Sequence, residues 1–279
     1  MILGIPASDF LLFVVVMACG AALAGFVAGL FGVGGGVVMV PILTELFALG
    51  LGGSSIEHAQ HLAVGTSLAI IVPTSIRSAR SHYASGTMDL DLLRRFLVFV
   101  PAGVLLGLYL ATILDARGLG AVFGGIALSV GLYQLFASTN LHVVKQVPGT
   151  PVAQVTGVAI GTSSTLMGIG GGVVNNVFMS LCGADIKRAI ATSSGVGVLI
   201  SIPAALGFVA IGLGQSQLPP LSLGYINFPT LAFMIPFTIV LAPIGARLTH
   251  RLPGVLTKRL FSVFLIVAAL RAFWKLFVG

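Results

Sequence analysis

Long apolar stretches separated by short polar segments cover most of this chain. Six of them are long enough to cross a bilayer, which takes about 20 residues. They run over residues 62–81, 93–114, 119–138, 188–212, 228–250 and 255–276. Two further apolar stretches, 9–52 and 152–184, are each interrupted by a run of three glycines. The pattern predicts an all-α polytopic membrane protein.

The two interrupted stretches contain copies of one glycine-rich phrase. Residues 31–38, FGVGGGVV, reappear as residues 167–174, MGIGGGVV, displaced by 136 positions. Downstream, residues 63–67 resemble residues 189–193. This second pair lies 126 positions apart, so the copies differ by insertions or deletions, and the self-similarity indicates a fold built by doubling one unit.

Composition agrees with a membrane protein, because 57% of the residues are hydrophobic and only 8% are charged. A soluble domain carries roughly 25% charged residues. The formal net charge of +7 does not indicate nucleic-acid binding, since the cations are scattered between the apolar stretches. Basic flanks of this kind orient a protein in its membrane.

The distribution of the basic residues predicts the topology. If each interrupted stretch enters the membrane and returns to the same face, while the other six cross once, 11 basic residues share one face and 3 the other. The larger set is Arg77, Arg80, Arg94, Arg95, Lys145, Lys187, Arg188, Arg247, Arg251, Lys258 and Arg259, and the smaller is Arg117, Arg271 and Lys275. Eight simple crossings would divide them 7 against 7. The positive-inside rule favours the first arrangement.

Each half then holds one glycine-broken re-entrant hairpin and three crossings, so the second half is inverted relative to the first. We predict a first transmembrane repeat at 1–140, a cytoplasmic linker at 141–151 and a second repeat at 152–279. Inverted repeats with interrupted helices are typical of secondary transporters, whose substrate site lies where the repeats meet.

The glycine runs are the first candidate binding elements. A helix that resumes after a break presents unpaired N–H groups with a partial positive charge, which suits an anion. The candidates are Gly32, Gly34, Gly35 and Gly36 in the first half and Gly168, Gly170, Gly171 and Gly172 in the second. The alternative is close helix packing of the small-xxx-small kind, which the pairs Gly25/Gly29, Gly103/Gly107 and Gly157/Gly161 also show.

Polar side chains within the apolar stretches are the second set of candidates. Thr66 and Ser67 match Thr192 and Ser193, while Asn175 and Asn176 stand where the first half has Met39 and Val40. Hydroxyl and amide donors suit an oxyanion that must be bound and released. A hydroxyl inside a helix can instead bond its own i−4 carbonyl.

Ionisable side chains are rare in these stretches. His61 titrates near neutral pH in water and is a candidate for proton coupling or gating, with an interfacial role as the alternative. Arg77 is a second gating candidate, with a positive-inside anchor as the alternative. Cys19 and Cys182 have no metal-ligand spacing around them, so neither a metal site nor a cofactor is predicted.

These motifs resemble the sulfite exporter TauE/SafE family, also called the 4-toluene sulfonate uptake permeases. The resemblance is carried by residues 29–36 (GLFGVGGG), Pro41-Ile42-Leu43, residues 63–68 (AVGTSL) and residues 167–172 (MGIGGG), and it covers essentially the whole chain. It implies a carrier in the bacterial inner membrane for small sulfur-containing anions such as sulfite, sulfonates or thiosulfate, driven by the proton gradient.

Three classes of function fit the sequence. A secondary transporter accounts for the repeat, the interrupted helices and the neutral polar residues together. A passive anion channel shares these features and lacks coupling, and the additional glycine-rich faces permit a homodimer in either case. An intramembrane enzyme with Ser67 or Ser193 as nucleophile needs a nearby base, and the second half has no histidine before His250.

Overall fold

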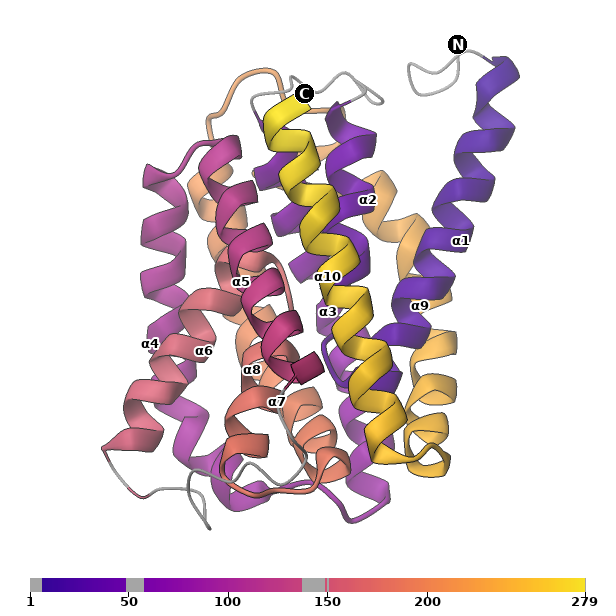
Figure 1. Cartoon of the computed structure of the whole chain (residues 1–279). Helices are drawn as coiled ribbons and strands as arrows, with labels where there is room; N and C mark the ends of the chain where they lie inside the picture. The colour runs from indigo at the N-terminus through magenta and orange to yellow at the C-terminus, as the bar shows by residue number, and fades with distance from the viewer. Residues whose placement is uncertain (1–6, 49–57, 137–148, 150, 279) are drawn as a thin grey trace.

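The computed structural model describes residues 7–48, 58–136, 149 and 151–278, and these form an almost entirely helical bundle (Figure 1). The first half contains α1 (Ala7–Phe31), α2 (Gly36–Ala48), α3 (Ala59–Ala84), α4 (Leu90–Ile113) and α5 (Ala116–Phe136). The second half contains α6 (Val152–Met167), α7 (Gly172–Leu181), α8 (Ile186–Gly212), α9 (Phe228–Arg251) and α10 (Gly254–Val278). Most of the predicted linker, 141–151, lies outside the described residues.

Six of the described helices are long and apolar enough to cross a membrane, namely α3, α4, α5, α8, α9 and α10. They coincide with the six predicted spanning stretches. The exposed large apolar side chains lie mainly on α4, α9 and α10, as expected of helices that face lipid. The protein is therefore a multi-pass membrane protein.

The other two apolar stretches break at the glycines, as the sequence predicts. Helix α1 ends before Gly32 and α2 begins at Gly36, while α6 ends before Gly168 and α7 begins at Gly172. Backbone φ is positive at Gly32 (65°), Gly35 (81°), Gly168 (66°) and Gly171 (80°). Residues with a side chain rarely adopt this conformation, so glycine ends each helix here.

The helices pack in pairs that join the two halves. Helix α1 packs against α9, α4 against α6, α5 against α10, and α3 against α8. Gly25 and Gly29 bring the backbone of α1 onto α9, and Gly103 and Gly161 bring α4 and α6 together in the same way. The small-xxx-small interpretation of these glycines is confirmed.

The bundle has two ends of different character, the upper and lower ends in Figure 1. The strand end carries both termini, the α4–α5 turn and the α8–α9 connection, where β1 (Ser222–Leu223) pairs antiparallel with β2 (Ile226–Asn227). Strands this short left no signal in the hydrophobic pattern. The opposite end, the arginine end, carries the α3–α4, α7–α8 and α9–α10 connections. Its described basic residues are Arg77, Arg80, Arg94, Arg95, Lys187, Arg188, Arg247, Arg251, Lys258 and Arg259.

Candidate functional site

The two glycine breaks lie directly against each other in the middle of the bundle. We call residues 32–36 and 168–172 together the glycine crossing. The N–H of Gly170 donates to the carbonyl of Val33 at 3.0 Å, which joins the breaks backbone to backbone. A Cβ atom on Gly34 would lie 3.3 Å from the Gly170 Cα. Only glycines allow an approach this close.

The two breaks contact each other reciprocally, each through the same positions of its repeat. A methyl group on Gly36 would overlap the carbonyl oxygen of Gly168, and one on Gly172 would lie 2.5 Å from that of Gly32. Gly36 and Gly172 hold the same place in the sequence repeat, as do Gly32 and Gly168. Each break therefore contacts the other through equivalent positions, with Gly34 and Gly170 between them.

The last backbone carbonyls of α1, which lead into the crossing, find hydrogen-bond partners in side chains from three other helices. The His82 ring Nε2 lies 3.2 Å from the Gly29 oxygen, and Thr249 donates its hydroxyl to the Leu30 oxygen at 2.6 Å. The third acceptor is the carbonyl of Phe31, described next. The last carbonyls of a helix lack intrahelical partners, so these bonds meet a need that membrane lipid cannot. His82, which directly follows a predicted span, and Thr249 were not among the site residues predicted from sequence.

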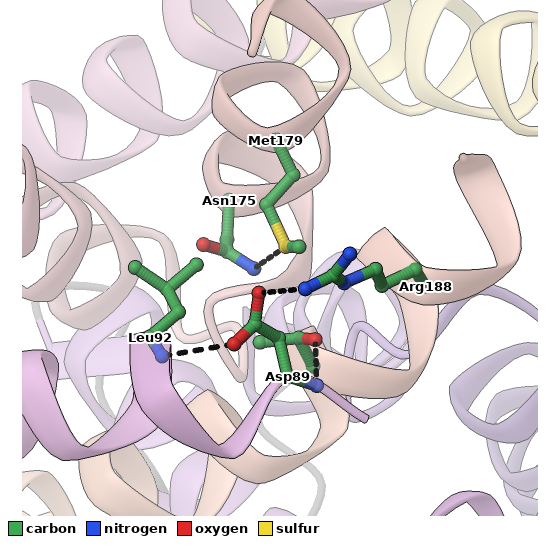
Figure 2. Close-up of polar contacts among 6 residues, drawn as sticks. Asp89, Leu92, Asn175, Met179 and Arg188 are labelled. Carbon is green, nitrogen blue, oxygen red and sulfur yellow. Dashed lines mark hydrogen bonds and ion pairs between the residues drawn. The ribbon is translucent and has the colours of Figure 1, made fainter. Parts of the chain in front are cut away.

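A directed chain of hydrogen bonds connects α7 and α8 to the crossing. Asn176 donates from Nδ2 to the Phe31 oxygen at 3.0 Å, and its Oδ1 accepts the Ser193 hydroxyl at 2.7 Å. Ser193 in turn accepts from Asn175 Nδ2 at 2.7 Å. This order fixes the Asn175 amide, whose Oδ1 has no hydrogen-bond partner in the described part of the chain. Figure 2 shows Asn175 directing its nitrogen toward Met179, whose sulfur lies 3.6 Å away.

The corresponding place in the first half is less polar. Ser67 donates its hydroxyl to the Gly168 oxygen at 2.9 Å, and its oxygen lies 4.0 Å from the Met39 sulfur. Met39 and Asn175 are equivalent in the repeat, so one side of the crossing has an amide where the other has a thioether. Neither Ser67 nor Ser193 contacts a histidine among the described residues, which gives no support to a nucleophilic role.

Thr66 and Thr192 lie away from this cluster. The Thr66 hydroxyl oxygen accepts from the N–H of Asn227 at 3.0 Å, and that of Thr192 accepts from the N–H of Asp89 at 2.9 Å. Asn227 and Asp89 are the N-cap residues of α9 and α4. These helices begin at opposite ends of the bundle. With a rise of 1.5 Å per residue along the central helices, the two threonines are about 20 Å apart, too far to bind one small ion.

An ion pair lies beside Thr192 at the arginine end. Arg188 donates to Asp89 at 2.7 Å, and the Asp89 side chain is only 9% exposed (Figure 2). The second Asp89 oxygen accepts from the N–H of Leu92, which caps α4. The pair joins the first turn of α8 to the start of α4, and it is linked to Asn175 through the consecutive residues Thr192 and Ser193.

The two gating candidates also lie outside the glycine crossing. His61 is buried near the strand end, with its Nε2 3.1 Å from the Ala111 oxygen and its ring centroid 5.1 Å from that of Tyr225. Arg77 is exposed near the arginine end and forms no ion pair within the described residues. Among the predicted site residues, Ser193 and the two asparagines therefore meet the crossing on one side, and Ser67 meets it on the other.

Comparison with known proteins gives the family. The family model described as Sulfite exporter TauE/SafE matches residues 17–272. The chain belongs to this family. The chain is 34% identical over 256 residues to a probable membrane transporter protein of Haemophilus influenzae, and the match covers 91% of this chain and 96% of the relative. It is 26% identical to the probable membrane transporter protein YdhB of Bacillus subtilis, covering 88% and 94%.

A third relative of the TauE/SafE protein, a probable membrane transporter protein of Methanocaldococcus jannaschii, is 24% identical and covers 88% of this chain and 89% of its own length. No solved structure matches the chain. The family and these relatives support a membrane transporter rather than an enzyme.

Proposed function

We propose that this protein is a secondary carrier of small sulfur-containing anions, of the sulfite, sulfonate or thiosulfate type, which alternates access between two inverted repeats. The observation that carries the proposal is the exchange of contacts at the glycine crossing, where Gly36 meets Gly168 and Gly172 meets Gly32. Interrupted helices that meet near the midplane are the usual place for the substrate of such carriers.

The packing of the helices supports the inverted repeat. Helix α1 packs on α9 and its repeat counterpart α6 packs on α4, the counterpart of α9. In Figure 1, α1 and α2 occupy the upper part of the bundle, whereas α6 and α7 occupy the lower part. We propose that these two helix pairs are re-entrant hairpins from opposite faces, with the arginine end in the cytoplasm.

We place the anion beside the crossing, at the start of α7. The described bundle engages the Gly170 N–H with Val33, so this backbone donor is not free for an anion in this state. Asn175 offers one side-chain N–H, the one now directed at Met179, next to the partial positive charge of the α7 N-terminus. The bond from Asn175 Nδ2 to the Met179 sulfur, at 3.6 Å, is weak because a thioether sulfur is a weak acceptor. Exchanging it for a substrate oxygen costs little.

Coupling to protons is the remaining part of the proposal. His61 and His82 are both buried on α3, one toward each end of the bundle. A ring nitrogen of each lies within hydrogen-bond distance of a backbone carbonyl, that of Ala111 for His61 and that of Gly29 for His82. A change in protonation of either ring alters how α3 is joined to α4 or to α1. We propose that this links the proton gradient to movement between the repeats.

Purified protein in liposomes tests the function directly. Flux is measured for sulfite, thiosulfate, taurine, sulfoacetate and sulfate, with and without a pH gradient. A carrier shows saturable uptake, a response to the gradient and stimulation by unlabelled substrate on the opposite side. Flux that increases linearly with concentration and ignores trans substrate identifies a passive channel. Asn175→Met, which copies Met39 of the first half, should reduce uptake about tenfold or more, because it removes a hydrogen bond to the charged substrate.

A further inference from the structure

A cavity of about 440 Å³ opens beside the crossing, at the strand end. It lies between α2, the start of α3, α5 and α10. Its lining includes Val40, which is 1% exposed and whose Cγ2 atom would contact a Cβ on Gly168. One valine side chain therefore separates the inner part of this cavity from the glycine crossing.

The cavity has a surplus of positive charge. Its lining contains Arg117, Arg271 and Lys275, the three basic residues of the strand end, and a single carboxylate, Glu45. Glu45 pairs with Arg271 at 3.1 Å and with Lys275 at 3.3 Å, so two cations share one anion. Arg117 forms no ion pair or hydrogen bond within the described residues. The described lining thus has a net charge of about +2, and Arg117 is available to a ligand.

A buried, uncharged hydrogen-bond donor lies beside these cations. Gln60 lines the cavity and is only 7% exposed. The Thr44 hydroxyl donates to Gln60 Oε1 at 2.7 Å, which leaves the amide nitrogen as a donor with no partner in the described part of the chain. An anion beside Arg117 would satisfy it.

The rest of the lining is apolar. Val40, Pro41, Phe123, Trp274 and Leu276 surround the charged groups. An inorganic oxyanion is comparable in size to one or two water molecules of about 30 Å³ each, so it would leave most of this volume to water against apolar walls. Pockets of 300–1,000 Å³ with few polar groups usually hold organic ligands.

We propose that this cavity binds a soluble organic anion with one negatively charged head and a compact apolar body, entering from the water at the strand end. The head lies on Arg117 and the Gln60 amide, and the body packs on Trp274 and Phe123. A role of this cavity as the loading site of the carrier rests on the proposed function. The binding of the anion in the cavity does not depend on it.

Binding is measured on the purified chain in phosphatidylcholine nanodiscs, without transport. Trp274 is the one tryptophan of the chain, so its fluorescence reports on the cavity directly. The probes are butanesulfonate, sulfite and the neutral butanesulfonamide, and calorimetry provides a second readout. We expect saturable binding of butanesulfonate, at least tenfold weaker binding of sulfite and no binding of the sulfonamide.

Two substitutions separate the cavity from general charge effects. Arg117→Gln should weaken butanesulfonate binding about 10- to 100-fold, because it removes a hydrogen bond to a charged group. Arg259→Gln, on an exposed arginine at the opposite end of α10, is the matched control and should leave binding unchanged. Arg117 is exposed, so its substitution should not disturb folding. Unchanged binding in Arg117→Gln overturns the proposal.

The outcomes also separate this site from a lipid site and from the carrier function. Loss of butanesulfonate binding in phosphatidylglycerol nanodiscs, with that lipid retained by native mass spectrometry, would assign the cavity to a lipid headgroup and overturn the proposal. Butanesulfonate binding without any anion flux in liposomes leaves the cavity standing and refutes the carrier. Saturable sulfite flux with no butanesulfonate binding in the cavity supports the carrier and overturns the proposed cavity site.

Discussion

Substituting Gly36 by alanine tests the contact on which the proposed mechanism depends. The added methyl group would meet the Gly168 oxygen and lie 2.8 Å from the Ile169 Cα. Ordinary contacts of a Cβ begin at 3.4 Å. Both opposing atoms are backbone atoms, so no rotamer change can make room. The two breaks must separate, by roughly 1 Å.

The energetic cost follows from what that separation breaks. The Gly170 N–H to Val33 bond, 3.0 Å long, is lost, and a buried donor without a partner costs about 1–3 kcal/mol. Overpacking adds about 1–3 kcal/mol. Replacing a helical glycine by alanine recovers up to about 1 kcal/mol. We expect Gly36→Ala to lower the free energy of unfolding by about 1–5 kcal/mol and to reduce anion flux.

The assay is unfolding in mixed micelles with increasing SDS, followed by tryptophan fluorescence, with flux in liposomes measured in parallel. Gly125→Ala on α5 is the control, because a Cβ there meets nothing within 4 Å. Gly172→Ala should behave like Gly36→Ala, since its methyl would lie 2.6 Å from the Val33 Cα. If Gly36→Ala is as stable and as active as Gly125→Ala, the backbone contact at the crossing is not real.

Three further predictions concern the threonines, the asparagine and the orientation. Thr66→Val and Thr192→Val should each lower the free energy of unfolding by about 1–3 kcal/mol, because each leaves the N–H of a helix N-cap residue without its acceptor. Thermal unfolding measures this loss, and substrate affinity should change less than stability. Asn175→Asp places a carboxylate where an anion is expected, so substrate should compete poorly and its apparent Kd should increase at least tenfold at neutral pH; unchanged affinity would remove Asn175 from the site. In a cysteine-free background, Ser216→Cys should react with an impermeant thiol reagent added to intact cells while Ser85→Cys is protected, and the opposite pattern would reverse the proposed orientation.

The spanning helices and their interruptions can be predicted from the amino-acid sequence alone. Six apolar stretches became helices because lipid offers the backbone no hydrogen-bond partners and each span must satisfy its own. The breaks were readable because consecutive glycines both lose helix stability and permit positive φ, as at Gly35 and Gly171. These are local effects, so neighbouring residues are sufficient to reveal them.

Tertiary structure decided which of the candidate side chains meet. Ser67 and Ser193 reach the crossing from its two sides. The adjacent Thr66 and Thr192 point instead to the N-caps of α9 and α4, because neighbouring residues on a helix face different directions. The cavity that Arg117, Arg271 and Lys275 share with Glu45 is formed by α2, α3, α5 and α10 together. Such clusters depend on which helices pack together, and in a membrane protein that choice is made by the close fit of small residues across helices distant in sequence rather than by hydrophobicity.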